Sequence, residues 1–360
     1  MHEPIAIPGM KRKTVFPWLL FTMTFLIAGS AVSTAQQQGR WAVPERTRSV
    51  KDDKGDKGSG KDDAIFRIKV GNQSMEIDAH LGGRITSFLV DGRNFLTDDK
   101  VDSLNWGSTF WPSPQSDWDW PPPAAIDNEP YTAALEGQGL KLVSKKSPAG
   151  LVVTKRISGD LQENSFLLNY TITNESGKTL KVAPWEITRV KTGGIAFFPM
   201  GAGERRGGLL PLTREKDGIV WFVYQEEGLP SKGDRQLYSD GSEGWLAELN
   251  GRTILVKQFP DIPLEAAAPK EGEVELYASP LVKDGAESGS AGKTSDLLKK
   301  DDGLRGYVEI EHQGTFQELE PGASSNWQVI WRVRQLPDSI KAEAGNPELV
   351  DFVRKLVKKS

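Results

Sequence analysis

Cysteine is absent from this 360-residue chain, and histidine occurs only three times. Without cysteine the chain forms no disulfide and carries no lipid-modified cysteine, so its stability must come from a buried core. The Gly193-Gly194 and Gly207-Gly208 pairs lack the helix and lysine context of a phosphate loop. No metal cluster has helical or paired-cysteine spacing, and a calcium site built from Asp117, Asp119 and backbone carbonyls is the weaker alternative. We therefore expect neither a metal nor any other cofactor.

An excess of basic residues is also missing, since the formal net charge is −4. A protein that neutralises nucleic-acid phosphates carries a basic surface, so this charge argues against a nucleic-acid partner. The length of the chain is enough for a large core in one domain.

The longest apolar stretch lies at the N-terminus, and none of spanning length follows it. Lys11-Arg12-Lys13 precedes the mostly apolar stretch from Val15 to Ile27, and Ser33-Thr34-Ala35 supplies small side chains. This order predicts a signal peptide over residues 1–35, cleaved after Ala35. An uncleaved anchor is the alternative, but Pro17 interrupts a run shorter than the ~20 residues that span a bilayer. The sequence thus predicts export to the periplasm or beyond, with no stable transmembrane segment after cleavage.

Two further segments have little apolar character. Residues 36–63 include PERTRSVKDDKGDKGSGKDD, which cannot bury enough surface to offset the entropy of ordering, so we expect a disordered charged linker. A polar stretch over residues 284–303 predicts a long surface loop. The main domain is then expected over residues 64–335, followed by a helical C-terminal segment over residues 336–360.

What the chain has in quantity is tryptophan, glycine and short alternating apolar runs, with 11 Trp and 37 Gly. Period-two patterns predict strands, for example over 66–70, 85–90, 166–172, 180–190, 307–312 and 327–333. Asp91-Gly92 and Asn250-Gly251 predict tight hairpins. One helix is expected, capped by Asn346 with Pro347 in its first turn. The sequence therefore predicts an all-β sandwich of antiparallel sheets with a short C-terminal helix.

Four motifs carry a resemblance to a known superfamily. They are IDAHLGGRITSFLVDGRNFL, NWGSTFWPSPQSDWDWPPP, NYTITNESGKTLKVAPWEITRV and YVEIEHQGTFQELEPGASSNWQVIWRV. Together they resemble an uncharacterised exported family of the galactose-mutarotase-like, or aldose 1-epimerase-related, superfamily. The resemblance implies a supersandwich of large antiparallel sheets that binds a sugar on the concave face of one sheet. It also implies carbohydrate as the partner.

The chemistry of that superfamily needs a proton donor and a base, supplied by a histidine and a glutamate. Where mutarotases carry the histidine, this chain has Pro184-Trp185-Glu186-Ile187-Thr188-Arg189. Arginine does not donate a proton at neutral pH, although Arg189 is suited to holding a sugar hydroxyl. By resemblance Glu309 is the candidate base, with Glu186 or His80 as proton donor. Glu309 and Glu311 share one face of their strand, and His312 points to the other.

The segment from Trp106 to Pro123 is the most unusual part of the chain. Indole faces stack on the C–H faces of pyranose rings, and prolines hold such a segment at low entropic cost. The candidate sugar-binding residues are Arg84, Trp111, Gln115, Trp118, Trp120 and Arg189. The alternative to sugar binding is a structural role, which would be core packing for the indoles and a salt bridge at a strand edge for Arg84.

Three functions remain open at this point. The first is an exported carbohydrate-binding protein. The second is an aldose 1-epimerase-like isomerase that acts at the anomeric centre with a glutamate base. The third is a structural envelope protein without a ligand. The first two differ in whether Glu309 lies beside Glu186 or His80 on the face that carries Trp111.

Overall fold

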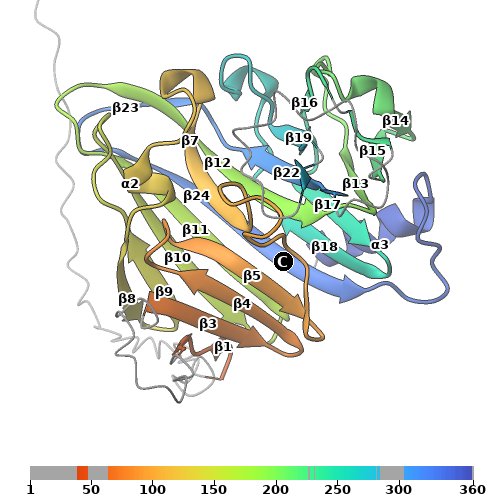
Figure 1. The fold of residues 1–360 in the computed structure, drawn as a ribbon, viewed down its shortest axis with the longest axis horizontal. Helices are drawn as coiled ribbons and strands as arrows, with labels where there is room; N and C mark the ends of the chain where they lie inside the picture. The colour runs from red at the N-terminus through yellow and green to blue at the C-terminus, as the bar shows by residue number, and fades with distance from the viewer. Residues whose placement is uncertain are drawn as a thin grey trace, which may run out of the picture.

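The computed structural model describes residues 39–47, 64–225, 228–230, 232–280, 282–283 and 304–358. The predicted signal peptide, most of the predicted linker and the predicted loop over 284–303 lie outside these residues. Within them, the secondary structure is almost entirely antiparallel strand, which confirms the predicted all-β class (Figure 1). No helix among the described residues has the length and apolar character to cross a membrane.

The first sheet has eleven strands and runs the length of the sandwich. Ten lie in one path: β14 (Thr213–Lys216), β15 (Ile219–Tyr224), β13 (Gly194–Pro199), β17 (Trp245–Asn250), β18 (Thr253–Gln258), β24 (Ser324–Gln335), β11 (Ser165–Asn174), β10 (Leu151–Asp160), β9 (Gly139–Val143) and β8 (Thr132–Glu136). The eleventh strand, β1 (Trp41–Ala42), pairs with β10.

The second sheet also has eleven strands and carries the candidate site. Its path is β16 (Gln236–Ser239), β19 (Val274–Ala278), β22 (Tyr307–Gln313), β12 (Leu180–Lys191), β7 (Ser108–Ser113), β5 (Arg84–Val90), β4 (Gln73–Asp78), β3 (Ile65–Val70) and β2 (Glu45–Arg46). Two short strands join it, β23 (Gln317–Leu319) beside β12 and β6 (Arg93–Asn94) beside β5. A separate pair is formed by β20 (Val282–Lys283) and β21 (Leu304–Arg305).

Part of the predicted linker is ordered. Trp41–Ala42 pairs with β10, and Glu45–Arg46 pairs with β3, so the prediction of disorder is wrong for these residues. The Arg40 side chain supports the first pairing, because its Nη2 lies 2.6 Å from Asp160 Oδ2. Edge pairing and one ion pair therefore order a stretch whose composition alone favours disorder.

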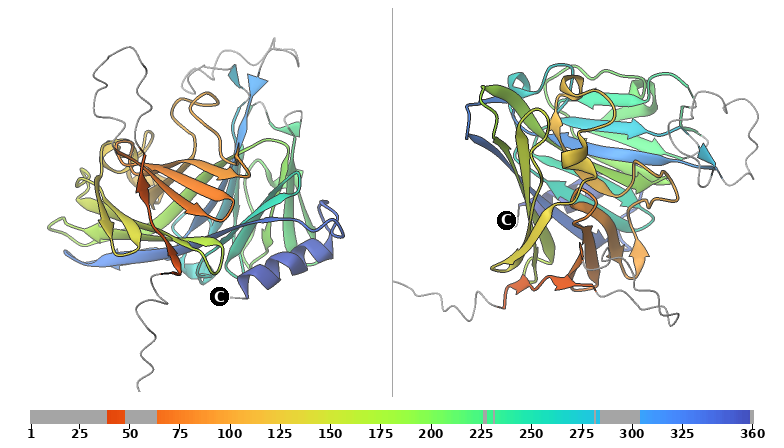
Figure 2. Two further views of the ribbon diagram at one scale, coloured as in Figure 1. Left: turned by 90° about the horizontal axis from the view of Figure 1, so that it is seen from below. Right: turned by 60° about the vertical axis from the view of Figure 1, so that its left-hand side comes forward.

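The two sheets pack face to face around the main core, and Figure 2 shows them as two layers. The alternation predicted for the last strand is confirmed, since Trp327, Val329, Trp331 and Val333 are all buried in this core. Both predicted hairpins form. Asp91 and Gly92 have positive φ between β5 and β6, whereas the second turn lies one residue later than predicted, at Gly251 and Arg252.

The predicted C-terminal helix is α3 (Pro347–Val357), and the Asn346 side chain accepts a hydrogen bond from the Glu348 amide. Its residues Leu349, Val350 and Val353 pack with Trp221 and Trp245 in a second cluster. This cluster lies on the outer face of the first sheet, so α3 covers one end of the sandwich (Figure 2). The other described helix is the short α2 (Ala124–Asp127), and 3-10 turns lie at Gln115–Asp117, Leu210–Leu212 and Leu264–Ala266.

Candidate functional site

A cavity of about 240 Å³ lies on the outer face of the second sheet, on the side away from the first sheet. We call it the glutamate pocket, because four of its lining residues are glutamates and none is Lys, Arg or His. It is lined by Asn105, Trp111, Gln115, Trp120, Trp185, Gln236, Tyr238, Glu271, Glu275, Tyr277, Tyr307, Glu309 and Glu311.

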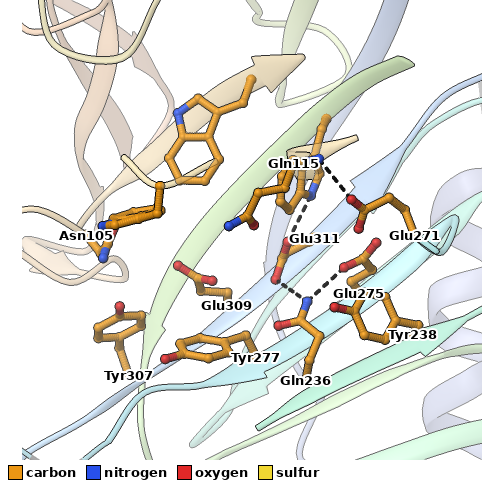
Figure 3. A pocket seen from close by; sticks show the side chains of 13 residues that line it. Asn105, Gln115, Gln236, Tyr238, Glu271, Glu275, Tyr277, Tyr307, Glu309 and Glu311 are labelled. Carbon is orange, nitrogen blue, oxygen red and sulfur yellow. Dashed lines mark hydrogen bonds between the residues drawn. The ribbon is translucent and has the colours of Figure 1, made fainter. Parts of the chain in front are cut away.

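The register of three adjacent strands explains why these side chains meet. Glu275 of β19 lies opposite Glu311 of β22, and Tyr277 lies opposite Glu309. Glu309 in turn lies opposite Arg189 of β12. Residues directly opposite each other in an antiparallel pair share a face, so the alternation in each strand brings this set to one side. Figure 3 shows Glu309, Glu311, Glu275 and Tyr277 grouped around one space.

Glu275 and Glu311 form the buried floor of the pocket, each with 1% of its surface exposed. The Gln236 side-chain amide donates to both carboxyl groups, at 2.8 Å to Glu275 and 3.3 Å to Glu311 (Figure 3). Burial, followed by repulsion from neighbouring glutamates, raises the pKa of both groups well above the usual range. Two like charges opposite each other in a sheet are unfavourable, so this arrangement acts on the pKa of both groups in the same direction as burial.

Glu309 has a different environment, because Arg189 lies directly beside it. Arg189 Nε is 2.7 Å from Glu309 Oε1, and its Nη1 donates to Thr109. Burial raises the pKa of Glu309, and the Arg189 charge opposes that rise. Arg189 is fully buried, and its guanidinium lies 5.1 Å from the ring centre of Trp111. Arg189 therefore positions a glutamate of the pocket and is not itself among the lining residues.

The tryptophan segment contributes to the pocket unequally. Trp111 and Trp120 line it, whereas Trp118 supports Trp111 from behind with ring centres 5.8 Å apart. Trp118 is also fixed by its indole N–H, which donates to the Pro112 carbonyl at 2.8 Å. Gln115 lines the pocket, and its backbone N–H donates to Glu271 at 2.9 Å (Figure 3). Trp120 is the most exposed of these indoles, with 49% of its surface accessible.

Glu186 lies on the opposite face of the second sheet, between the two layers. It is fully buried opposite His312, at 3.2 Å from the His312 ring nitrogen and 2.9 Å from Lys257 Nζ. Trp331 donates to the same oxygen at 3.0 Å. Although burial opposes it, the Lys257 charge and the His312 hydrogen bond hold the Glu186 pKa well below its usual range. The predicted pairing of Glu186 with Glu309 is therefore not formed, because adjacent residues along β12 alternate between faces.

His80 and Arg84 lie outside the glutamate pocket. His80 follows β4 and lines a different hollow with Phe66 and Tyr131. Arg84 is buried at the start of β5 and forms an ion pair with Asp127 at 3.1 Å. The structure thus brings together Glu309, Trp111, Gln115 and Trp120 with Arg189 behind them, and leaves Glu186 and His80 elsewhere.

Sequence reasoning did not name as site residues Glu271, Glu275, Gln236, Asn105, Trp185 and the three tyrosines of the pocket. A signal existed for one strand, because Glu275 and Tyr277 alternate with apolar residues in the same way as Glu309 and Glu311. The sequence does not show that β16, β19 and β22 are adjacent strands, because that order is set by the fold.

No protein-family model matches the chain, and no curated protein matches its sequence. Solved structures do match its fold. A protein from Klebsiella pneumoniae subsp. pneumoniae, provisionally assigned as an aldose 1-epimerase, has a TM-score of 0.51 at 14% identity. The match covers 88% of this chain and 86% of that chain.

A TPR-domain containing protein from Parabacteroides distasonis has a TM-score of 0.52, also at 14% identity. This match covers 78% of the present chain and 49% of the other, so the present chain spans about half the length of that protein. The predicted galactose-mutarotase-like fold is confirmed. At 14% identity, these matches show that the fold is shared and do not show a shared function.

Proposed function

We propose that this chain, which has the galactose-mutarotase-like fold, is an exported protein that binds a carbohydrate in the glutamate pocket. The observation that carries the proposal is the composition of one cavity, in which indole and phenol rings stand beside amide and carboxyl groups. Aromatic rings suit the C–H faces of a pyranose, and the polar groups suit its hydroxyls. Export rests on the sequence pattern of residues 1–35.

The electrostatics of the pocket favour a neutral sugar. Four glutamates line it without a basic residue among the lining side chains, and only Glu309 has an ion-pair partner among the described residues. A sugar carboxylate or phosphate would add a further negative charge to this space, at a cost in Coulomb energy. Hydroxyl groups both donate and accept, so they match carboxyl groups in either protonation state.

A second candidate function is acid–base chemistry at the anomeric centre, favoured by the different surroundings of the glutamates, since Arg189 contacts Glu309 and no basic residue lines the pocket beside Glu275 and Glu311. Mutarotation needs a base for the anomeric hydroxyl and an acid for the ring oxygen. In this scheme Glu309, held by Arg189, is the carboxylate, and Glu275 or Glu311, whose pKa burial raises, is the acid on the same face. In this alternative, Glu309 keeps the role expected from the sequence and the proton donor is Glu275 or Glu311.

The first experiment measures binding of neutral monosaccharides to the full chain by saturation-transfer NMR and calorimetry. We expect glucose, galactose, mannose or N-acetylglucosamine to bind, and Glu311→Gln to weaken binding because it changes the pocket floor. Glu318→Gln is the matched control, since Glu318 is exposed on β23. Absence of binding by all four sugars, with the protein folded, would refute the proposal.

A second measurement separates binding from catalysis. Exchange NMR of the α and β anomers of each bound sugar gives the anomerisation rate with and without protein. Acceleration that is lost in Glu309→Gln and kept in Glu318→Gln would support the isomerase. Binding without acceleration would leave the carbohydrate-binding function and exclude the isomerase for those sugars.

A further inference from the structure

A second cavity adjoins the glutamate pocket and has a wall in common with it. It measures about 250 Å³, and Asn105 and Trp120 line both cavities. We call it the side pocket; its remaining lining is Leu81, Arg84, Asp99, Ser103, Leu104, Trp106, Pro121, Pro122, Asp127 and Asn128. Small-molecule sites usually begin near roughly 300 Å³, so each cavity alone is small and the two together are of ordinary size.

Trp120 stands between the two cavities with about half of its surface free. Its ring centre lies 6.0 Å from that of Trp111, with the rings inclined at 71°. The Trp111 contact holds the indole edge-on, and 49% of the Trp120 surface stays accessible. A large apolar side chain that is fixed in place and still exposed marks a contact surface for a ligand.

Arg84 forms a fixed part of the side-pocket wall. Only 3% of its surface is exposed, and its two terminal nitrogens donate to the Leu104 carbonyl and to Asp127. Its Nε is buried without a hydrogen-bond partner among the described residues. Because this atom has no accessible surface, a ligand in the side pocket does not reach it, and Arg84 contributes to the site as a wall residue held by its two terminal nitrogens.

Asp127 connects the walls of the two cavities. Its Oδ1 accepts from the Trp111 indole at 2.8 Å, and its Oδ2 accepts from Arg84 at 3.1 Å. One carboxylate therefore positions a lining residue of each cavity. Trp106 completes this arrangement, because the Arg84 guanidinium lies 5.3 Å from its ring centre. The two cavities are built as one unit.

We propose that the glutamate pocket and the side pocket form a single site for a neutral oligosaccharide of at least two residues. Adjacent sugar residues occupy the two cavities on either side of Trp120. This inference rests on the proposed carbohydrate-binding function, and it adds the length of the ligand.

The test compares each monosaccharide with its disaccharides by calorimetry on the full chain. The pairs are glucose with cellobiose and maltose, galactose with β-1,4-galactobiose, mannose with β-1,4-mannobiose, and N-acetylglucosamine with chitobiose. We expect at least one disaccharide to bind tenfold or more tightly than its monosaccharide. Equal affinities within every pair would overturn the two-cavity inference and leave the proposed function standing.

A cavity-filling variant checks the location. Ser103 is exposed and lines only the side pocket, so Ser103→Trp should occupy that cavity without touching the glutamate pocket. The disaccharide should then bind no better than the monosaccharide, whose own affinity stays unchanged. Ser339→Trp, at another exposed serine, is the matched control and should keep the full advantage. A loss of monosaccharide and disaccharide affinity by the same factor in Ser103→Trp would overturn the inference, and no binding by any sugar would refute the proposed function with it.

Discussion

Replacing Lys257 by Met tests whether the ion pair between Lys257 and Glu186, which lies between the two sheets, stabilises the fold. Both side chains are fully buried, and the ion pair between them measures 2.9 Å. Lys257→Met removes the cation with little change in volume and leaves the Glu186 carboxylate without its ion pair to lysine, next to His312 and Trp331. Removing one partner of a buried ion pair costs about 3–5 kcal/mol, because the other charge stays buried without compensation.

That cost is large against the roughly 5–15 kcal/mol that stabilises a typical domain. Urea unfolding followed by tryptophan fluorescence measures it as a lower midpoint at an unchanged m-value. The double variant Glu186→Gln/Lys257→Met removes both charges, so it should recover most of the loss. A single variant that loses less than about 1 kcal/mol, or a double variant as unstable as the single one, would refute the assignment of a buried ion pair.

The remaining predictions concern the glutamate pocket. Burial raises the pKa of Glu275 and Glu311 in the folded state, whereas the same groups in the unfolded state release their protons near pH 4.3. The folded state therefore binds more protons than the unfolded state, and the free energy of unfolding should fall as the pH rises from about 5 to 7. Urea unfolding across that range should show a shallower fall in Glu311→Gln; an identical slope would contradict the raised pKa. Trp120→Ala should weaken sugar binding by about 1 kcal/mol, which is about fivefold in the Kd measured by calorimetry. The melting temperature should stay unchanged, because the indole is half exposed. Leu135→Ala, at another exposed apolar residue, is the control. Glucuronate should bind at least tenfold more weakly than glucose at pH 7, and equal affinity would show that the glutamates do not exclude anions.

The sequence predicted the features that are determined by residues close together along the chain. Alternation gave the strands and the common face of Glu309 and Glu311, and Asn346 with Pro347 gave the start of α3. Local composition also marked the tryptophan segment, of which Trp111 and Trp120 line the pocket.

Features that depend on pairing between distant strands could not be predicted in the same way. Glu186 and Arg189 both lie on β12, but an odd separation of three residues puts them on opposite faces, and only Arg189 lies opposite Glu309. Glu275 reaches the pocket because β19 pairs with β22, an order that local patterns do not give. Trp41 joins the first sheet through pairing with Asp160, which the polar composition of its surroundings concealed.

The alternation along β12 separates two sets of constraints within a single strand. Trp185 and Arg189 face outward toward the cavity region, while Glu186 and Thr188 face inward toward Lys257. Ligand preference can therefore be redesigned at every second position without rebuilding the interior, and the interior can be repacked without disturbing recognition. A single shift in strand register would exchange the two sets and lose both.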